Sequence, residues 1–501
     1  MKTNTLDFDA QALRDKILDL AMRGKLVPQD PNDEPASVLL EKIKAEQAEL
    51  VKEKKIKKSK PLPEITDDEK PFDIPDSWEW VRLGEVGNYI QRGRSPKYDK
   101  KNKSHPIISQ KCVQWENIYL KDAKYITKTF FDKLEDYRFV QENDVLWNST
   151  GTGTVGILNI VKQNLDHIPV DSHVTLIRMN KQVNPDYIYY YLRSPEIQDN
   201  LNDYLTGTTK QKELGLTNIL KVKIPLPPLS EQSRIAAKIA QLFALLRKVE
   251  TSTQQYAKLQ TLLKSKVLDL AMRGKLVKQD PNDEPASVLL EKIKAEKAEI
   301  VKEKKIKKSK PLPPITDEEK PFDIPDSWEW VRLGNIVSYQ NGYAYKSSEL
   351  VKIRKGLPVI KSQNIMTLKV IIKDNNDYVK EPNEKMLNSK IIKGDLLMCL
   401  SSQSKNPEPL GKTAIYDLDK PALLNQRVLK LKLINHSMTD LIYYFINSSW
   451  FHFTVSHRGS GSGQSNLKLG DVMNMPIPVP PLNEEKHIVN RIEILFKKLS
   501  N

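Results

Sequence analysis

Apolar residues recur at alternating spacings of four and three through the centre of the 501-residue chain. The spacing starts at Ile235 and ends at Leu270, and nine of its eleven positions are apolar. Such a pattern is typical of a helix that buries one narrow stripe against a partner helix. Ser230 suits the first cap of this helix, and Arg273-Gly274 suits its end. The pattern therefore predicts a coiled-coil helix of about 60 Å, at ~1.5 Å per residue.

The two ends of the chain repeat parts of this helix. The segment 477–499 (IPVPPLNEEKHIVNRIEILFKKL) matches 224–246 (IPLPPLSEQSRIAAKIAQLFALL) and repeats its apolar spacing. At the other end, Leu6, Ala10, Leu13, Ile17 and Leu20 match Tyr256, Gln260, Leu263, Val267 and Leu270. We therefore expect a second helix that is split in two, antiparallel to the first, with the two termini close together opposite its middle.

The repeat extends well beyond the helices. Lys16–Gly84 and Lys266–Gly334 differ at six positions. Each copy runs from AMRGKLV through a polar turn (QDPNDEP) and a predicted short helix (ASVLLEKIKAE) to a Pro-rich linker that ends in SWEWVRLG. A repeat of this length indicates a duplicated block of domain size rather than a solenoid unit.

Two globular segments of unlike sequence follow the linkers and share one succession of elements. The strand-like stretch 140–151 corresponds to 391–402, 156–161 to 411–416, and 172–180 to 425–433, while the helix-like stretch 185–195 corresponds to 439–449. The predicted fold class is α+β. It consists of two pseudo-symmetric globular domains, each a mixed β-sheet with helices, separated by a long antiparallel coiled coil.

These patterns divide the chain into seven parts. The predicted parts are N-terminal helices (1–60), a linker (61–76), a first globular domain (77–228), the central helix with a short helix (229–310), a second linker (311–326), a second globular domain (327–481) and a C-terminal helix (482–501).

The formal net charge of +15 adds little to this plan. The two runs KEKKIKKSK (52–60 and 302–310) each carry +5 and so account for +10 of it, which favours solvated helix ends over a DNA-binding surface. Cys112 and Cys399 are the two cysteines, which excludes a disulfide framework, and both are expected to be core residues. No apolar run approaches the length of a membrane span. We expect a soluble, cytoplasmic protein.

The order of globular domain, helical spacer, globular domain and helical spacer resembles the specificity subunits of type I restriction-modification systems. The helix start PLPPLSEQ (225–232), LAMRGKLV with QDPNDEPA, and SWEWVRLG carry the resemblance, which covers essentially the whole chain and is similar to members with a circularly split second spacer. It implies that each globular segment is a target recognition domain for one half of a bipartite site on double-stranded DNA. It further implies that the helices dock two methyltransferase subunits, and that restriction (motor-nuclease) subunits join for cleavage.

The motifs of catalysis are missing from the chain. No Asn-Pro-Pro-Tyr/Phe or Asp-Pro-Pro-Tyr tetrapeptide occurs, and GTGTVG (151–156) lacks the Lys-Ser/Thr of a phosphate loop. The histidines show no metal-ligand spacing. We therefore expect a non-catalytic subunit without metal or cofactor. The resemblance implies that S-adenosylmethionine belongs to the methyltransferase partner, and that ATP and Mg belong to the restriction partner.

Candidate DNA contacts are chosen by residue type and loop position. Arg, Lys, Gln and Asn can donate to base edges, while small hydroxyl residues suit phosphates. In the first domain they are Arg92, Arg94, Lys97 and Tyr98 in an early loop, Ser109, Gln110 and Lys111 after a strand, and Thr208, Thr209, Lys210 and Gln211 in a late loop. In the second domain they are Tyr343 and Lys346, then Lys361, Gln363 and Asn364, and finally Arg458, Ser462, Gln464 and Asn466.

Two other classes of function remain open at this point. One is a coiled-coil scaffold, and a related one is a stand-alone DNA-binding protein without a methyltransferase partner. A self-sufficient enzyme is disfavoured by the missing motifs. Copurification with a methyltransferase discriminates among these classes.

Overall fold

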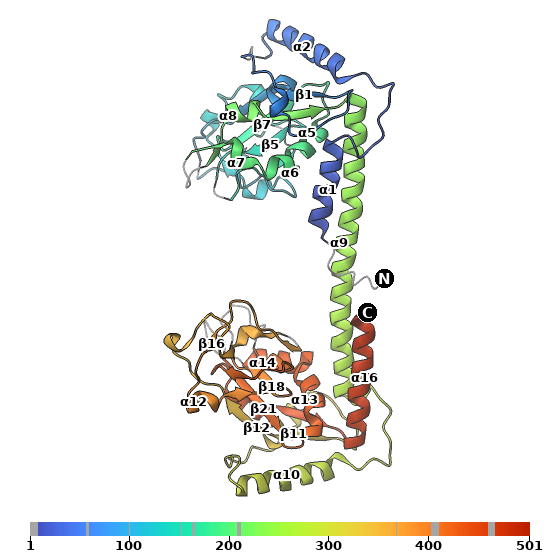
Figure 1. The fold of residues 1–501 in the computed structure, drawn as a ribbon, viewed down its shortest axis with the longest axis vertical. Helices are drawn as coiled ribbons and strands as arrows, with labels where there is room; N and C mark the ends of the chain where they lie inside the picture. Colours follow the sequence, from blue (N-terminus) through green and yellow to red (C-terminus); the bar gives the residue numbers. More distant parts are fainter. Residues whose placement is uncertain are drawn as a thin grey trace. The chain divides into compact units, whose positions relative to one another are not determined.

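The structure is a computed structural model that describes residues 9–56, 60–99, 101–151, 153–162, 165, 167–207, 212–366, 368–401, 410–458 and 466–500. The chain forms two compact units, Met1–Thr253 and Gln254–Asn501, which are considered one at a time below. Each unit combines long helices with a globular α+β domain (Figure 1). Within the described residues, no helix is long and apolar enough to span a membrane.

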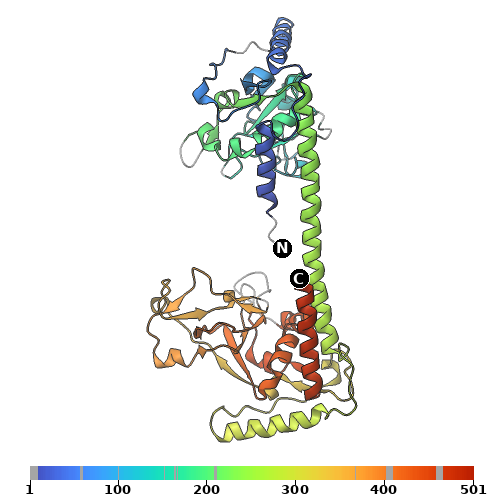
Figure 2. The same cartoon turned by 45° about the vertical axis from the view of Figure 1, so that its right-hand side comes forward.

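The long central helix predicted from the apolar spacing is confirmed as α9 (Leu229–Met272), a helix of 44 residues. It begins one residue before the expected cap and contributes residues to both units. In the first unit, α1 (Ala10–Met22) packs beside α9, as both views show (Figure 1, Figure 2). An Arg14–Glu250 ion pair of 2.5 Å joins the start of α1 to a point well along α9, and Gln29, which follows α1, contacts Glu231 in the first turn of α9, so these two helices are antiparallel.

In the second unit, α16 (Leu482–Ser500) packs against the last part of α9 (Figure 2). The side-chain amide of Gln260 donates to the carbonyl of Leu499, and Leu268 and Met272 share a hydrophobic cluster with Ile488. The late part of α16 therefore lies beside the middle of α9, and its early part lies beside the end of α9. This pair is also antiparallel.

The apolar stripe of α9 is buried near the start of the helix but not at its middle. Ile235 and Ile239 are fully buried, whereas Val249 is 45% exposed and Tyr256 is 50% exposed. These exposed positions lie where the short helices end, and polar contacts of Arg14 with Glu250 and of Gln260 with Leu499 replace apolar packing there. The expected meeting of Met1 and Asn501 lies outside the described residues.

The repeated AMRGKLV marks the same helix end in both units. Gly24 and Gly274 follow α1 and α9 with φ of +67° and +65°, a backbone region that side chains other than glycine rarely adopt. A Cβ on Gly24 would also lie 2.4 Å from the ring of Pro75 in the linker, and one on Gly274 would lie 2.5 Å from Pro325. Glycine therefore stops each helix and lets the linker pass close to its end.

The first globular domain is built on an antiparallel sheet with strand order β2-β7-β5-β6. Short helices pack on one face of this sheet. Residues of α1 and α9 belong to the same hydrophobic cluster as these helices and this face of the sheet. The remaining elements of the first unit are α2 (Ala36–Lys52), β1 (Glu79–Arg82), α3 (Leu83–Val86), β2 (Gly87–Arg92), β3 (Pro106–Ile107), β4 (Lys124–Tyr125), α4 (Lys128–Phe131), β5 (Val145–Asn148), β6 (Leu158–Ile160), β7 (Val174–Met179), α5 (Pro185–Leu192), α6 (Pro195–Gln198), α7 (Leu201–Tyr204), β8 (Leu205–Thr206), β9 (Glu213–Leu214), α8 (Leu216–Leu220) and β10 (Lys223–Leu226).

The second globular domain repeats this sheet as β12-β21-β18-β19 and adds the sheet β16-β13-β20-β17. In the added sheet β13 and β20 are parallel and the other pairs are antiparallel, which confirms the mixed α+β prediction. The elements of this unit are α10 (Ala286–Lys302), β11 (Glu329–Arg332), α11 (Leu333–Ile336), β12 (Val337–Asn341), β13 (Leu357–Ile360), β14 (Ile365–Met366), β15 (Lys369–Val370), β16 (Tyr378–Val379), α12 (Glu384–Leu387), β17 (Lys390–Ile391), β18 (Leu396–Cys399), β19 (Thr413–Ile415), β20 (Ala422–Leu424), β21 (Val428–Leu433), α13 (Thr439–Ile446), α14 (Ser449–Arg458), α15 (Leu469–Met473) and β22 (Pro476–Val479).

The chain enters and leaves each domain through one antiparallel pair of strands. β1 pairs with β10, with Arg82 opposite Lys223, and β11 pairs with β22, with Arg332 opposite Pro476. The long helices α9 and α16 begin three residues after β10 and β22 end. Each domain is therefore attached to its helix at the place where the domain also begins.

A buried carboxylate in the first turn of each long helix holds this attachment. Glu231 is 1% exposed, and it accepts hydrogen bonds from the indole of Trp78 at 2.9 Å and from the side chain of Gln29 at 2.6 Å. Burial raises the pKa of Glu231, although the two hydrogen bonds favour the charged form and oppose the rise. Glu484 accepts the same pair of hydrogen bonds from Trp328 and Gln279.

The residue after this carboxylate differs between the two copies. Gln232 donates to the carbonyl of Pro227 at 2.8 Å and accepts from the backbone N–H of Asn184 at 2.8 Å. The matching residue of α16 is Glu485, which is 2% exposed and has one carboxylate oxygen, Oε2, without a hydrogen-bond partner. Burial raises the pKa of Glu485 to about 7, with the charge of Asp440 adding to the rise and that of Lys486 opposing it.

We predict that Glu485→Gln stabilises the second unit above about pH 7. The folded state keeps the proton of Glu485 up to a pKa of about 7, whereas the unfolded state loses it near the ordinary value of 4.5. Stability therefore falls as pH rises between these two values and stays low above them. Glutamine removes this loss, which amounts to at most about 3 kcal/mol.

Urea unfolding from about pH 5 to pH 8 measures this effect. Gln232→Glu is the matched control, because it should introduce the same loss of stability with rising pH into the first unit. A stability difference between Glu485→Gln and the parent protein that does not change with pH would contradict the prediction.

Candidate nucleic-acid interface

One end of the main sheet gathers loops from several parts of the first domain. Arg92 ends β2 and Asn148 ends β5, and both pair with the start of β7, at Thr175 and Val174 respectively. The described residues of the loops 93–98, 149–151, 153–157 and 171–173 therefore lie at the same end of the sheet. The late loop joins them through a β-bridge between Thr150 and Glu213. We call these loops, together with their counterparts in the second domain, the loop edge.

The second domain builds its loop edge in the same way. Asn341 pairs with Leu429 and Cys399 pairs with Val428, and a bridge between Ser401 and Asn466 brings in the late loop. In each domain a glycine allows the early loop to pass close to the backbone of the segment that leads into β7 or β21. A Cβ on Gly93 would lie 1.9 Å from the carbonyl oxygen of Val170, and one on Gly342 would lie 2.1 Å from that of Asn425.

The early loop of the first domain holds four of the predicted contact residues. Arg92 forms an ion pair with Glu213 and donates to the carbonyl of Leu214 at 2.6 Å, so it ties the early loop to the late loop. Arg94 pairs with Glu135 at 2.8 Å and keeps a side chain that is 46% exposed. Lys97 and Tyr98 are exposed, and the ammonium of Lys124 lies 4.6 Å above the ring of Tyr98. Arg94, Lys97 and Tyr98 are therefore open to solvent.

The predicted contacts after the next strand separate into buried and exposed residues. Ser109 is 3% exposed, and its backbone N–H donates to the sulfur of Cys112. Ser109 is therefore part of the turn rather than a side chain open to DNA. Gln110 is half-buried beside Gly151, and Lys111 is exposed.

The matching turn of the second domain divides in the same way. Asn364 is fully buried, donates to Asn376 at 2.7 Å and to the carbonyl of Ile371 at 2.8 Å, and accepts from the backbone of Lys361 at 2.9 Å. Its role in this structure is to hold the turn. Gln363 is exposed.

The electrostatics of this turn centre on Asp377. The ammonium of Lys361 lies 2.5 Å and that of Lys352 lies 2.8 Å from its carboxylate. Burial alone would raise the pKa of Asp377, but these two ion pairs outweigh burial and lower the pKa. Lys361 is therefore engaged within the protein.

Tyr343 and Lys346 lie in the early loop of the second domain. Tyr343 is half-buried with its ring 4.9 Å from that of Tyr345, and Lys346 is exposed. In the late loop, Asn466 lies at the loop edge through its bridge to Ser401. The other predicted contacts of the late loops, Thr208, Thr209, Lys210, Gln211, Ser462 and Gln464, and the side chain of Arg458, lie outside what the structure describes.

The two domains hold equivalent turns in which an asparagine and a cysteine have exchanged places. In the first domain, Asn148 at the end of β5 donates to the carbonyl of Gln110 at 3.0 Å, and Cys112 accepts from the turn. In the second domain, Cys399 occupies the place of Asn148, and Asn364 occupies the place of Cys112. Both cysteines are fully buried, which confirms them as core residues, and burial raises the pKa of each thiol.

The pairing of strands identifies two equivalent positions of the loop edge that the alignment of segment 172–180 with segment 425–433 missed. Asn148 pairs with Val174 and Cys399 pairs with Val428, so Val174 corresponds to Val428. The correspondence of 172–180 with 425–433 is therefore wrong by one residue. His173 and Arg427 become equivalent positions at the centre of the loop edge, next to the first residues of β7 and β21. The His173 side chain is 46% exposed, and the buried Asp171 lies 3.4 Å from its Nδ1.

The described residues contain no group of three or more His, Cys, Asp or Glu side chains that could hold a metal ion. The loop edge instead presents cationic, amide and hydroxyl groups, which are suited to hydrogen bonding with base edges and phosphates.

Comparisons with known proteins agree with this arrangement. Residues 75–260 and 325–501 match the family described as the type I restriction modification DNA specificity domain. The chain is 34% identical over 543 residues to the specificity subunit of the type I restriction enzyme EcoAI from Escherichia coli, covering 98% of this chain and 89% of that protein. It is 30% identical over 550 residues to the EcoEI specificity subunit from the same species, with the same coverage.

A solved structure described as the structural basis of complex assembly and conformational transition of the type I R-M system shares the fold. Its TM-score is 0.55 at 20% identity, and the match covers 86% of this chain and 92% of that one. The class of protein defined by these matches is a non-catalytic DNA specificity subunit. The chain belongs to the family of type I restriction-modification specificity subunits.

We predict that Asn364→Ala destabilises the second domain by about 2–4 kcal/mol, because it leaves buried hydrogen-bonding groups without partners. Gln363→Ala, at the exposed neighbouring position, should change stability by less than about 0.5 kcal/mol. Chemical denaturation of both variants measures the difference. Equal stability of the two variants would show that Asn364 does not hold the turn.

Proposed function

We propose that each globular domain reads one half of a bipartite site on double-stranded DNA through its loop edge. The observation that carries this proposal is that the two loop edges share one backbone frame and present different side chains. Arg94 occupies the place of Tyr343, Lys111 that of Gln363, and His173 that of Arg427. A common frame with different hydrogen-bonding groups is what two readers of different sequences require.

The roles of these residues follow from their chemistry. Exposed Lys97, Lys111 and Lys346 suit phosphates, which position a protein on the duplex without reading its sequence. Arg94, Gln110, His173 and Gln363 can donate to base edges in the major groove. The residues of the late loops, Thr208 to Gln211 and Ser462 to Asn466, also contact DNA in this proposal. Ser109 and Asn364 support their turns from inside.

The repeated segments outside the domains would bind two copies of one partner. Supporting this, Lys16–Gly84 and Lys266–Gly334 differ at six positions, while the domains that follow them have diverged. We infer that this partner is a methyltransferase that brings S-adenosylmethionine, and that a restriction subunit with ATP and Mg joins the complex for cleavage. The complex would act in the cytoplasm, and α1 and α16 would be the halves of a circularly split second spacer.

A stand-alone DNA-binding protein or a coiled-coil scaffold is the alternative function. Exchange of one domain separates these possibilities from the proposal. Replacing residues 85–224 with the matching segment of another specificity subunit should change one half of the methylated site and leave the other half unchanged. Methylome sequencing of a strain carrying the exchanged protein measures this outcome. Changes in both halves would contradict two independent readers, and an unchanged site would exclude a role in recognition.

We further predict that the central helix sets the gap between the two half-sites. Four residues inserted after Thr253 lengthen a helix by about 6 Å, which is close to two base pairs of duplex. The insertion should be tolerated, because Val249 and Tyr256 on either side of it are about half exposed. Methylome sequencing should then show the same half-sites with a longer gap. Retained activity with the original gap would mean that another segment sets the spacing.

A further inference from the structure

Each unit contains a groove between its Pro-rich linker and the strand through which the chain enters the globular domain. In the first unit the groove has a volume of about 490 Å³ and also reaches Leu40 and Lys44 of α2. In the second unit it has a volume of about 540 Å³. The linings repeat one another at a spacing of 250 residues, from Pro63 and Pro313 to Val81 and Val331.

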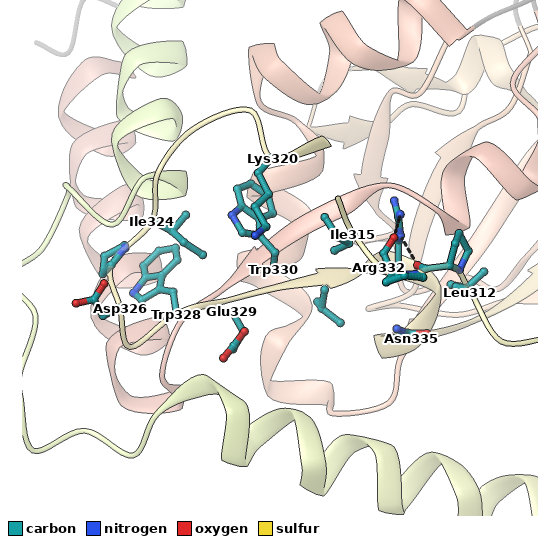
Figure 3. A pocket seen from close by; sticks show the side chains of 14 residues that line it. Leu312, Ile315, Lys320, Ile324, Asp326, Trp328, Glu329, Trp330, Arg332 and Asn335 are labelled. Carbon is teal, nitrogen blue, oxygen red and sulfur yellow. Dashed lines mark hydrogen bonds between the residues drawn. The ribbon is translucent and has the colours of Figure 1, made fainter. Parts of the chain in front are cut away.

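One edge of a β-strand forms the floor of this groove. β1 pairs with β10 on one side, and within the described residues no strand pairs with its other side; the same holds for β11 and β22. Consecutive residues of the strand line the groove, which places its unpaired edge there. Figure 3 shows Trp330 and Glu329 pointing to opposite sides of β11. An unpaired strand edge offers backbone donors and acceptors to an extended peptide.

The groove combines apolar walls with an acidic rim. Ile65, Ile74 and Trp80 and their counterparts supply the apolar surface. The lysine that lines both grooves is already paired, Lys70 with Asp67 at 2.5 Å and Lys320 with Asp317 at 2.7 Å, and the first groove also has the exposed Lys44 at its α2 side.

Two carboxylates of the rim are exposed and repeated in both units, Asp76 and Glu79 in the first and Asp326 and Glu329 in the second. An acidic rim on a chain of net charge +15 favours a basic residue in whatever occupies the groove.

We propose that each groove binds an extended segment of one methyltransferase subunit, which adds a strand to the free edge of β1 or β11. The segment carries a large apolar side chain for the wall formed by Ile65, Ile74 and Trp80, and a lysine or arginine for the acidic rim. This inference rests on the proposed function and names the place where its twofold partner binds. The nearly identical linings account for the binding of the same segment twice.

The position of the groove leaves the DNA-reading surface free. β1 leads through α3 into the start of β2, whereas the loop edge begins at the other end of β2, at Arg92. β2 has six residues, which corresponds to about 20 Å at ~3.3 Å per residue. A peptide in the groove and DNA at the loop edge can therefore bind one domain at the same time.

Charge reversal of the rim tests the proposal in the full chain purified with its methyltransferase. Asp76→Arg with Glu79→Arg should lower the number of bound methyltransferases from two to one per chain, and Asp326→Arg with Glu329→Arg should do the same. The fourfold variant should bind at least tenfold more weakly at both sites. Asp68→Arg with Glu318→Arg is the matched control, because these exposed acids lie on the linkers outside the lining and should leave binding unchanged.

Hydrogen exchange provides a second measurement that does not depend on substitutions. The backbone amides of Trp80 and Trp330, which alternate with the paired residues and so face the unpaired edges of β1 and β11, should exchange at least tenfold more slowly when the methyltransferase is bound. A fourfold variant that still binds two methyltransferases with parent affinity, or amides of both strands that gain no protection, would overturn the groove as the docking site. A parent chain that binds no methyltransferase would instead overturn the proposed function, so the two failures are distinguishable.

Discussion

The hydrogen bonds to one buried carboxylate decide where each globular domain sits on its helix. Glu231 lies in the first turn of α9, Trp78 leads directly into β1, and Gln29 belongs to the turn after α1, so three distant segments meet at one side chain. A carboxylate buried without donors would be strongly unfavourable, so the fold requires all three segments to arrive together. From this point β1 leads through α3 into β2, which ends at the loop edge. The orientation of the loop edge therefore depends on a contact at the opposite end of the sheet.

The frame of the loop edge is held by backbone hydrogen bonds and by side chains that face inward. This explains how the two domains can keep one geometry with little sequence in common. The exchange of asparagine and cysteine between Asn148 and Cys112 in one domain and Cys399 and Asn364 in the other keeps each turn closed from inside. Side chains that point outward from the same turns, such as Lys111 and Gln363, are under no such constraint. Their chemistry can vary without cost to the fold.

The sequence predicted the elements that depend on periodicity and repetition. The spacing of apolar residues was sufficient for α9, and the repeated helix start at 477–499 was sufficient for α16. These patterns were not sufficient to predict burial within short turns. Ser109 and Asn364 have the polarity of surface residues, but both are buried in their turns, where Asn364 makes three hydrogen bonds that no spacing in the sequence records. The one-residue error at 172–180 arose because strand register is set by the partner strand, which no local pattern records.

The paired strands β1 and β10 have a consequence for how such a protein can change over generations. Because a domain begins and ends at one place, flanked by stretches that occur twice in the chain, a gene can lose one domain and gain another by recombination between the repeats. The new domain needs only to preserve the short pair of strands and the tryptophan that directly precedes the first of these strands. The helices, the linkers and the buried carboxylates are then inherited unchanged. A lineage can in this way acquire a whole new domain in a single genetic event, rather than through a series of partly functional intermediates.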